Sequence, residues 1–312
     1  MIKNICSIIV FLLVVLEGCP QLLFASDDVL YVGVLESRGT NWPDWPMKND
    51  QELSRKVRVL FLKKANKWSS LETEITSPIY PKKVNWHVAF DGKCLGRFKS
   101  ILDRPPHKIE WALPRDTFHK PITNNLPLIG EPTEEFSGWI GGRYPRPLVV
   151  VSSQNCSDPQ KWKPFKPDTE SLKLVIPVFR KHLVDRKCPG PLQDKYFTSL
   201  KSYKSSDGHK LIQLTLEDDG KFRKESYWRL VKWFSITPEQ EVRNLSTMVD
   251  SKYIGDEFTD DDDSNMNLID AGDYDGDDKS EVVFWVARYD RDGYILFYDT
   301  FAHHVEFGWA YH

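Results

Sequence analysis

Short apolar segments separated by turn-forming pairs are the feature that most constrains the fold of this chain. Most of the segments are dense in Val, Ile, Phe, Tyr and Trp, side chains that fit a pleated, half-buried surface. They cover residues 29–35, 57–62, 86–90, 148–151, 211–216, 228–233, 282–287, 294–298 and 305–311. Between segments stand Asp-Gly pairs, which readily adopt the positive φ of tight hairpin turns, at Asp91-Gly92, Asp207-Gly208, Asp219-Gly220 and Asp292-Gly293. The pattern predicts an antiparallel, all-β fold.

The strands of such a fold must also cover their edges, because exposed edges invite aggregation. A β-propeller does this with four-stranded blades, and at roughly 40–60 residues per blade a chain of 312 residues holds about five to seven. Paired β-sandwiches are the alternative architecture. In either case we expect the segment 305–311 to close the fold by pairing with an early strand, 29–35.

One segment competes with the strand pattern. In residues 170–184, apolar side chains fall at helical spacing, but Pro177 lies inside the segment. Proline removes a helix hydrogen bond and clashes with the preceding turn. The sequence therefore predicts a broken helix or a bent strand here.

The N-terminus has the features of a secretory signal peptide. Lys3 precedes an apolar stretch, residues 8–16, that is too short to cross a bilayer, and small residues follow at Ala25 and Ser26. We therefore expect a signal peptide at 1–25, a single all-β domain at 26–312, and a secreted or periplasmic protein. Residues 16–19 resemble a bacterial lipobox, so lipidation of Cys19 is the alternative and the one expected route to a membrane.

The remaining cysteines are Cys94, Cys156 and Cys188. In an oxidising compartment two of the three can form a disulfide. Cys156 and Cys188 both flank proline-rich loops, and we expect these two to pair.

The charge of the chain is small overall but unevenly distributed. The formal net charge is -3, which argues against a dedicated nucleic-acid binder. Residues 256–281 contain 12 acidic residues and one basic residue, so this window carries -11 and the rest of the chain +8. The run Asp260–Asp263 is typical of a solvated acidic loop.

The second half of the acidic window has the spacing of a calcium loop. Counting from Asp273, carboxylates stand at positions one, three, five and nine, and the backbone carbonyl of Lys279 occupies position seven. Calcium takes six to eight oxygen ligands, and a loop with this spacing can curl around it. An EF-hand would need Glu at position twelve, where Phe284 stands, and flanking helices. The sequence predicts a structural Ca²⁺ site with the ligands Asp273, Asp275, Asp277, Lys279 and Glu281.

Residues 271–277, followed by Glu281 and three apolar residues, resemble the calcium loop of FG-GAP or VCBS repeats. These repeats occur in the β-propeller of integrin α subunits and in many secreted bacterial proteins. The resemblance implies that Asp273, Asp275, Asp277 and Glu281 are side-chain ligands in a loop that joins two strands of one blade. Asp278 stands where the motif usually has glycine, and aspartate tolerates the left-handed conformation required there.

These features favour a calcium-stabilised binding or structural protein whose partner is a carbohydrate or a protein at the cell surface. No P-loop, HExxH or GxSxG pattern occurs. The alternative is an extracellular polysaccharide hydrolase or lyase on the same fold. That enzyme would need two or three acids with perturbed pKa values in a pocket apart from the loop at 273–281.

Overall fold

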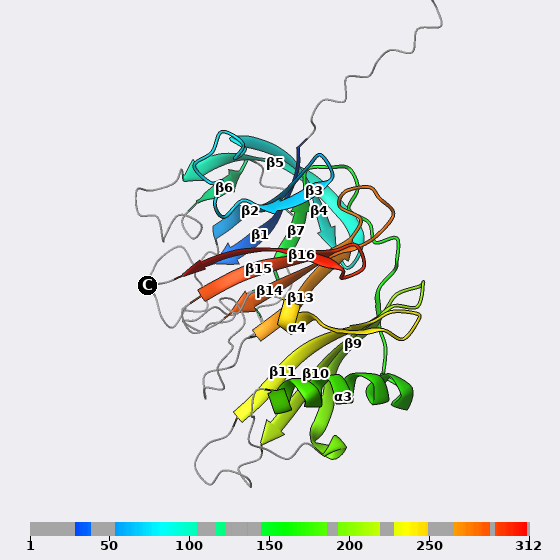
Figure 1. The fold of residues 1–312 in the computed structure, drawn as a ribbon. Coiled ribbons are helices and arrows are strands. Elements are labelled where there is room, and N and C mark those ends of the chain that lie inside the picture. Colours follow the sequence, from blue (N-terminus) through cyan, green and yellow to red (C-terminus); the bar gives the residue numbers. More distant parts are fainter. Residues whose placement is uncertain are drawn as a thin grey trace, which may run out of the picture.

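The computed structural model describes residues 29–38, 54–104, 117–122, 126, 136, 145–185, 193–218, 228–248, 265–287 and 291–310. The expected signal peptide, Cys19, Cys188, the Asp219-Gly220 pair and the run Asp260–Asp263 lie outside these residues. The described part consists mainly of strands in three antiparallel sheets (Figure 1). The prediction of an all-β fold is thus confirmed.

The first sheet has seven strands in the order β1-β7-β4-β5-β6-β2-β3, and β1 also pairs with β2. The order of pairing β1-β7-β4-β5-β6-β2 therefore closes back on β1. Its strands are β1 (Leu30–Arg38), β2 (Ser54–Lys64), β3 (Lys67–Ser70), β4 (Lys83–Phe90), β5 (Lys93–Arg104), β6 (Phe118–Pro121) and β7 (Leu148–Val151).

The second sheet has five strands in the order β12-β11-β10-β9-β8. They are β8 (Lys163–Pro164), β9 (Phe197–Lys204), β10 (Lys210–Asp218), β11 (Trp228–Ile236) and β12 (Val242–Asn244). The helices in the described residues are α3 (Thr169–Asp185), the single turn η3 (Asp194–Tyr196) and α4 (Leu245–Met248). None of the helices in the described ranges combines the length and apolar character needed to cross a bilayer.

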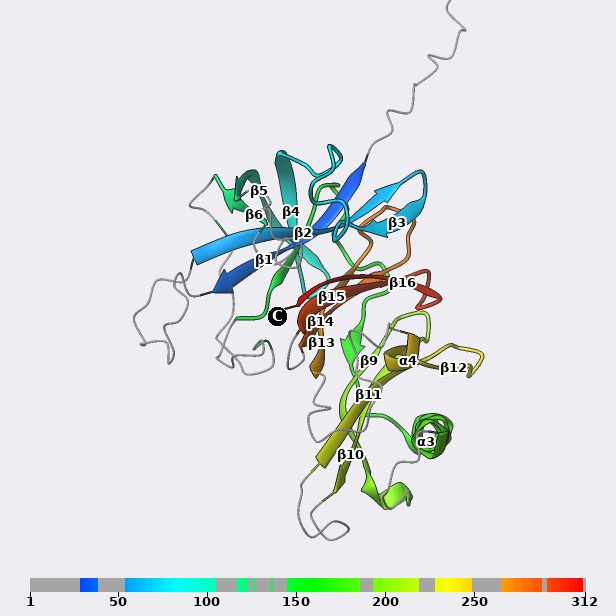
Figure 2. The same cartoon turned by 60° about the vertical axis from the view of Figure 1, so that its left-hand side comes forward.

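The third sheet is a four-stranded meander of β13 (Asn265–Gly272), β14 (Glu281–Ala287), β15 (Arg291–Tyr298) and β16 (His303–Ala310). It lies between the other two sheets (Figures 1 and 2). All seven residues of β14 are buried. Because successive side chains of a strand point to opposite faces, Trp285 packs into the core shared with the seven-stranded sheet. Phe284 packs into the core shared with the five-stranded sheet.

The protein is therefore layered: seven-stranded sheet, four-stranded sheet, five-stranded sheet and helix α3. The outer face of the five-stranded sheet packs on α3, where Phe179 contacts Phe234 with ring centroids 5.5 Å apart. The five to seven four-stranded blades of a propeller are not confirmed, since one sheet has four strands and the others have seven and five. Apolar side chains on both faces of β14 and β15 favour stacking of sheets face to face.

The structure confirms two of the predicted turns and corrects a third. Asp91-Gly92 forms the β4–β5 hairpin with φ of 49° and 68°, and Gly208 has φ of 99° between β9 and β10. Asp292-Gly293, however, lies within β15 and is not a turn. A Cβ on Gly293 would lie 2.7 Å from the Phe307 carbonyl oxygen, so this glycine permits close approach of two strands.

The second correction concerns the segment around Pro177, which forms the continuous helix α3. Pro177 is on its exposed face, while Val175, Phe179 and Leu183 are buried against the five-stranded sheet. Burial of this apolar face offsets the hydrogen bond that proline removes.

The expected pairing of the segment 305–311 with 29–35 is also wrong. β1 already has β2 and β7 as neighbours, so neither of its edges is open. β16 pairs with β15, and it packs near β2 and β3.

A buried histidine in the seven-stranded sheet is expected to make the stability of the protein depend on pH. His119 of β6 is fully buried, and its Nδ1 lies 3.0 Å from Ser100 Oγ. Burial lowers the pKa of His119 to about 4, although a hydrogen bond to the backbone of Pro81 opposes the shift. Neutral His119 therefore contributes to the free energy of unfolding, by at most about 3 kcal/mol. This contribution is complete above pH 6.5, the pKa of histidine in the unfolded chain, and is lost as the pH falls to 4.

Urea unfolding of wild type and His119→Gln between pH 4 and 7.5 measures this contribution. The variant should lose less stability than wild type over the interval, since other titrating groups are common to both proteins. Parallel curves would contradict the assignment to His119.

Candidate metal centre

The acidic loop at 273–280 joins β13 to β14, two antiparallel neighbours. Gly276 has φ of 81° and Asp278 has φ of 64°, so both adopt the left-handed conformation that curls the loop. The expectation that Asp278 tolerates this conformation is confirmed. The local sequence thus accounts for the shape of the loop.

The loop brings three of the predicted ligands together. Ligand oxygens of Asp273, Asp275 and Glu281 lie within 4.8 Å of one another. Asp277 is outside this group: it is exposed, and its Oδ1 accepts the Lys279 N–H at 2.9 Å. The Lys279 side chain points to Asp299, with Nζ 2.6 Å from Oδ1.

Backbone donors hold all three grouped carboxylates in place, and Asp275 Oδ1 accepts the Asp277 N–H at 3.2 Å. Asp273 Oδ1 accepts the N–H groups of Gly276 at 2.6 Å and Asp277 at 3.0 Å, and Oδ2 accepts that of Asp278 at 3.2 Å. Glu281 Oε2 accepts the Tyr274 N–H at 2.7 Å. These bonds orient the carboxylates before any ion binds.

The charges in this group are not fully balanced by the hydrogen bonds. Glu281 is 1% exposed, and its burial, together with the charge of Asp275, raises its pKa to about 9. Burial also raises the pKa of Asp273, against the effect of its backbone donors. Desolvated acids with raised pKa values lack compensating positive charge.

One basic side chain reaches the group from another sheet. Lys63 of β2 forms an ion pair with Asp275, whose side chain is 3% exposed. The two residues are 212 positions apart in the sequence. Lys63 was not predicted as part of the site, because nothing in the local sequence around it indicates the contact.

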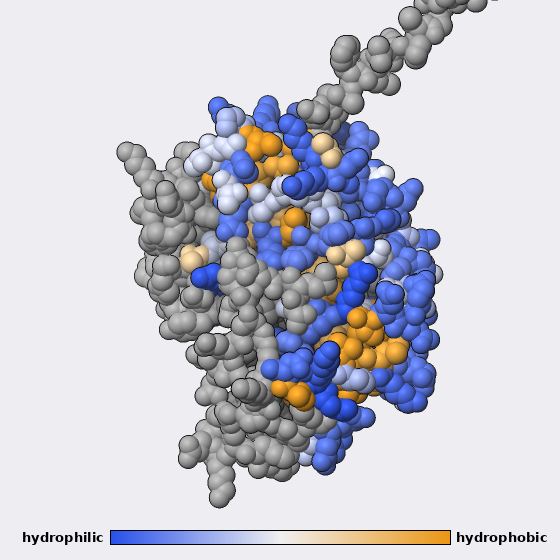
Figure 3. Space-filling model, viewed as in Figure 1, coloured by the Kyte–Doolittle hydropathy of each residue, from blue (hydrophilic) through white to orange (hydrophobic). Residues whose placement is uncertain are grey.

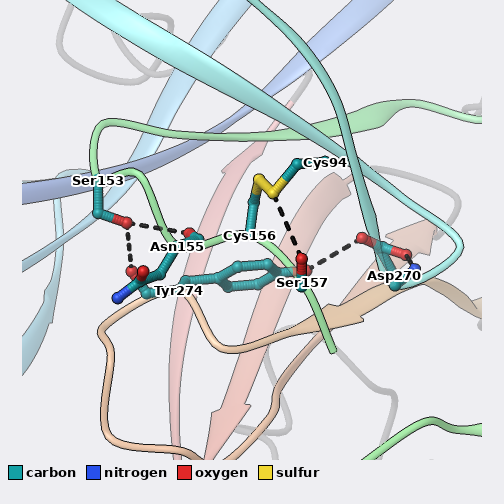
Figure 4. Close-up of a disulfide and its surroundings, with 8 residues drawn as sticks. Cys94, Ser153, Asn155, Cys156, Ser157, Asp270 and Tyr274 are labelled. Carbon is teal, nitrogen blue, oxygen red and sulfur yellow. Dashed lines mark hydrogen bonds between the residues drawn. A yellow bond between two sulfur atoms is a disulfide. The ribbon is translucent and has the colours of Figure 1, made fainter. Parts of the chain in front are cut away.

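A segment that follows β7 runs alongside the acidic loop (Figure 4). Ser153 Oγ donates to the Tyr274 carbonyl at 2.8 Å, and the Asp273 N–H donates to the Ser157 carbonyl at 2.9 Å. Further along, Ser280 Oγ donates to Asp158 Oδ1 at 2.6 Å. We call residues 153–160 the brace, since its contacts run from one end of the loop to the other.

A disulfide attaches the brace to the seven-stranded sheet. Cys94 of β5 pairs with Cys156, and their Cα atoms are 5.4 Å apart. The expected Cys156–Cys188 pairing is therefore wrong. Proximity in the sequence to proline-rich loops was the basis of that expectation, whereas the fold places Cys156 beside the start of β5.

A further buried acid lies next to the loop. Asp270 of β13 accepts the Gly92 N–H at 3.2 Å and the Tyr274 hydroxyl at 3.4 Å. Burial raises the pKa of Asp270 to about 7, against the effect of the Gly92 N–H. Asp270 thus connects the loop to the hairpin between β4 and β5, a contact that sequence spacing did not indicate.

The donor set fits calcium. Three carboxyl groups offer hard oxygen ligands, and a divalent cation would supply the positive charge that keeps them ionised. Asp273, Asp275 and Glu281 would hold the ion, and backbone carbonyls and water are the usual source of the remaining oxygens. Comparison with protein-family models, with curated proteins and with solved structures finds no match for this chain.

Proposed function

We propose that this chain is a secreted or periplasmic all-β binding protein in which a calcium ion at the loop 273–281 stabilises the fold. The observation that carries the proposal is the grouping of Asp273, Asp275 and Glu281, two of which have pKa values raised mainly by burial. The resemblance of the loop to FG-GAP and VCBS repeats supports the choice of calcium. Carbohydrate or protein at the cell surface is the proposed class of partner.

A structural role for the ion follows from what surrounds the loop. Lys63 lies in the seven-stranded sheet and the Cys94–Cys156 disulfide attaches the brace to that sheet, whereas the loop joins two strands of the four-stranded sheet. Charge neutralisation at the loop would strengthen the junction of two layers. Three acids with raised pKa values, Asp270, Asp273 and Glu281, lie at this junction.

We further infer that the fold is a stack of β-sandwiches and not a propeller. The basis is the four-stranded sheet, which shares one core with each neighbouring sheet. The up-and-down order of its four strands resembles one propeller blade, whereas the seven-stranded and five-stranded sheets do not.

Removing calcium is expected to lower the melting temperature. An ion that binds only the folded state at about 100 times its dissociation constant adds roughly 2.7 kcal/mol to the free energy of unfolding. Differential scanning calorimetry in EDTA and in excess calcium measures the difference. An unchanged midpoint would sink the proposal of a calcium site.

Two conservative variants locate the effect. Glu281→Gln keeps an acceptor for the Tyr274 N–H but removes one ligand charge, so the response to calcium should largely disappear. Asp277→Asn lies in the same loop but outside the grouped carboxylates, and most of the response should remain. A full response in Glu281→Gln would exclude the loop as the site.

A further inference from the structure

Lys63 brings a positive charge from the seven-stranded sheet to the acidic loop. It lies in β2, opposite Leu30 of β1 and Trp68 of β3, so a neighbouring strand holds its backbone on each side. Its side chain is 18% exposed and forms an ion pair with Asp275, whose side chain is 3% exposed. Successive side chains of a strand point to opposite faces, and Lys64 is exposed. The strand therefore directs Lys63, and not Lys64, to the loop.

The ammonium group of Lys63 and a metal ion would both be attracted to the same carboxylate. Asp275 is one of three acids whose ligand oxygens lie within 4.8 Å of one another. An ion bound among these oxygens would lie close to the Lys63 ammonium group, because that group already pairs with Asp275. Like charges at such short range repel strongly in a partly buried site. The ion must displace Lys63 or bind against its charge, and either lowers the affinity of the loop.

The basic residue within the loop has a different position. Lys279 Nζ lies 2.6 Å from Asp299 Oδ1, and both side chains are about half exposed, so water screens their charges. Residues 276–279 are exposed, and the right-hand side of the molecule, where this loop lies in Figure 1, is largely hydrophilic (Figure 3). Ions from solvent can therefore reach the loop. The partly buried charge that opposes them is that of Lys63.

We propose that Lys63 sets the calcium affinity of the loop, because its ammonium group competes with the ion for Asp275. This inference rests on the calcium site proposed above. Ligand charge tunes calcium dissociation constants from about 10⁻⁹ M to about 10⁻³ M, and extracellular modules lie at the weak end. One positive charge beside three carboxylates moves the site towards that end. The loop then binds calcium where the ion is abundant and stays paired with Lys63 of β2 where it is scarce.

Isothermal titration calorimetry with calcium chloride tests the proposal. Lys63→Gln removes the charge but keeps a hydrogen-bond donor, so calcium should bind to this variant at least about tenfold more tightly than to wild type. Lys63→Arg keeps the charge, and its affinity should stay near that of wild type. Lys67→Gln is the matched control. It removes the charge of an exposed residue of β3, and solvent screening should limit the change in affinity to less than about threefold.

The melting temperature gives a second readout. Without calcium, Lys63→Gln leaves Asp275 buried without its ion-pair partner, so the variant should melt below wild type. In saturating calcium the ion supplies the missing charge, and the difference should shrink or reverse. A purely structural Lys63 would instead produce the same loss in both conditions.

The outcomes separate this inference from the calcium site itself. Equal calcium affinity in wild type and Lys63→Gln, or an equal loss of melting temperature with and without calcium, would overturn the role of Lys63 and leave the calcium site standing. Calcium binding to Lys63→Gln alone would support that role and show that the lysine neutralises the native loop. Calcium binding to neither protein would overturn the calcium site, and this inference with it.

Discussion

Replacing Arg58 with methionine is expected to lower the free energy of unfolding by about 4 kcal/mol, because the change leaves the charge of Glu36 buried without its partner. Arg58 of β2 is 5% exposed and Glu36 of β1 is 3% exposed. Arg58 Nε and Nη2 lie 3.2 Å from the two carboxylate oxygens of Glu36. The pair is thus bidentate and almost fully removed from water.

The same pair connects two layers. The Tyr294 hydroxyl of β15 donates to Glu36 Oε1 at 2.6 Å, and the Arg58 guanidinium lies 4.3 Å from the ring centroid of Trp309 in β16. Loss of Arg58 therefore disturbs the contact between the seven-stranded and four-stranded sheets. Urea unfolding followed by tryptophan fluorescence measures the change.

The double variant Glu36→Gln/Arg58→Met is the control. It removes the buried charge together with its partner, so it should be about 2 kcal/mol more stable than Arg58→Met alone. If the single and double variants unfold at the same urea concentration, an unbalanced buried charge is not the cause of the loss.

The disulfide accounts for the second large effect. Cys94 and Cys156 are 62 residues apart. Crosslinking a loop of that length lowers the entropy of the unfolded chain, which raises its free energy by about 4 kcal/mol at 25 °C. Cys94→Ala/Cys156→Ala should be destabilised by about that amount. Thermal melts of the variant and of wild type with and without reductant provide the measurement.

Cys188→Ala is the matched control, because it removes a cysteine that the observed pairing does not use. Its stability should stay within about 1 kcal/mol of wild type. A larger loss in Cys188→Ala than in the double variant would contradict the Cys94–Cys156 pairing. The double variant should also respond less to calcium, since the disulfide holds the brace against the acidic loop.

The parts of the fold that were predictable are those that local sequence determines. Alternating and β-branched segments identified strands such as β4, β10 and β15, and Asp91-Gly92 identified a hairpin. Pairing between distant strands was not predictable. β1 joins both β2 and β7, and the hydrophobic pattern of each strand is compatible with many neighbours. The same limit explains the wrong partner expected for residues 305–311.

The candidate site divides in the same way. The curl of the loop and the grouping of Asp273, Asp275 and Glu281 follow from spacing within nine residues of sequence. The contacts of Lys63, the brace and Cys94 come from segments more than a hundred residues away. Such contacts follow from the layering of the sheets, which no local motif indicates.

The central position of the four-stranded sheet also bears on how the chain is made. Its strands leave the ribosome after those of the other two sheets, yet they fill the space between them. Until β14 and β15 emerge, the apolar faces of the seven-stranded and five-stranded sheets have no covering layer. Nascent chains with uncovered apolar faces are prone to aggregate, so assembly of this fold depends on synthesis of the four-stranded sheet and on protection of the two other sheets until then.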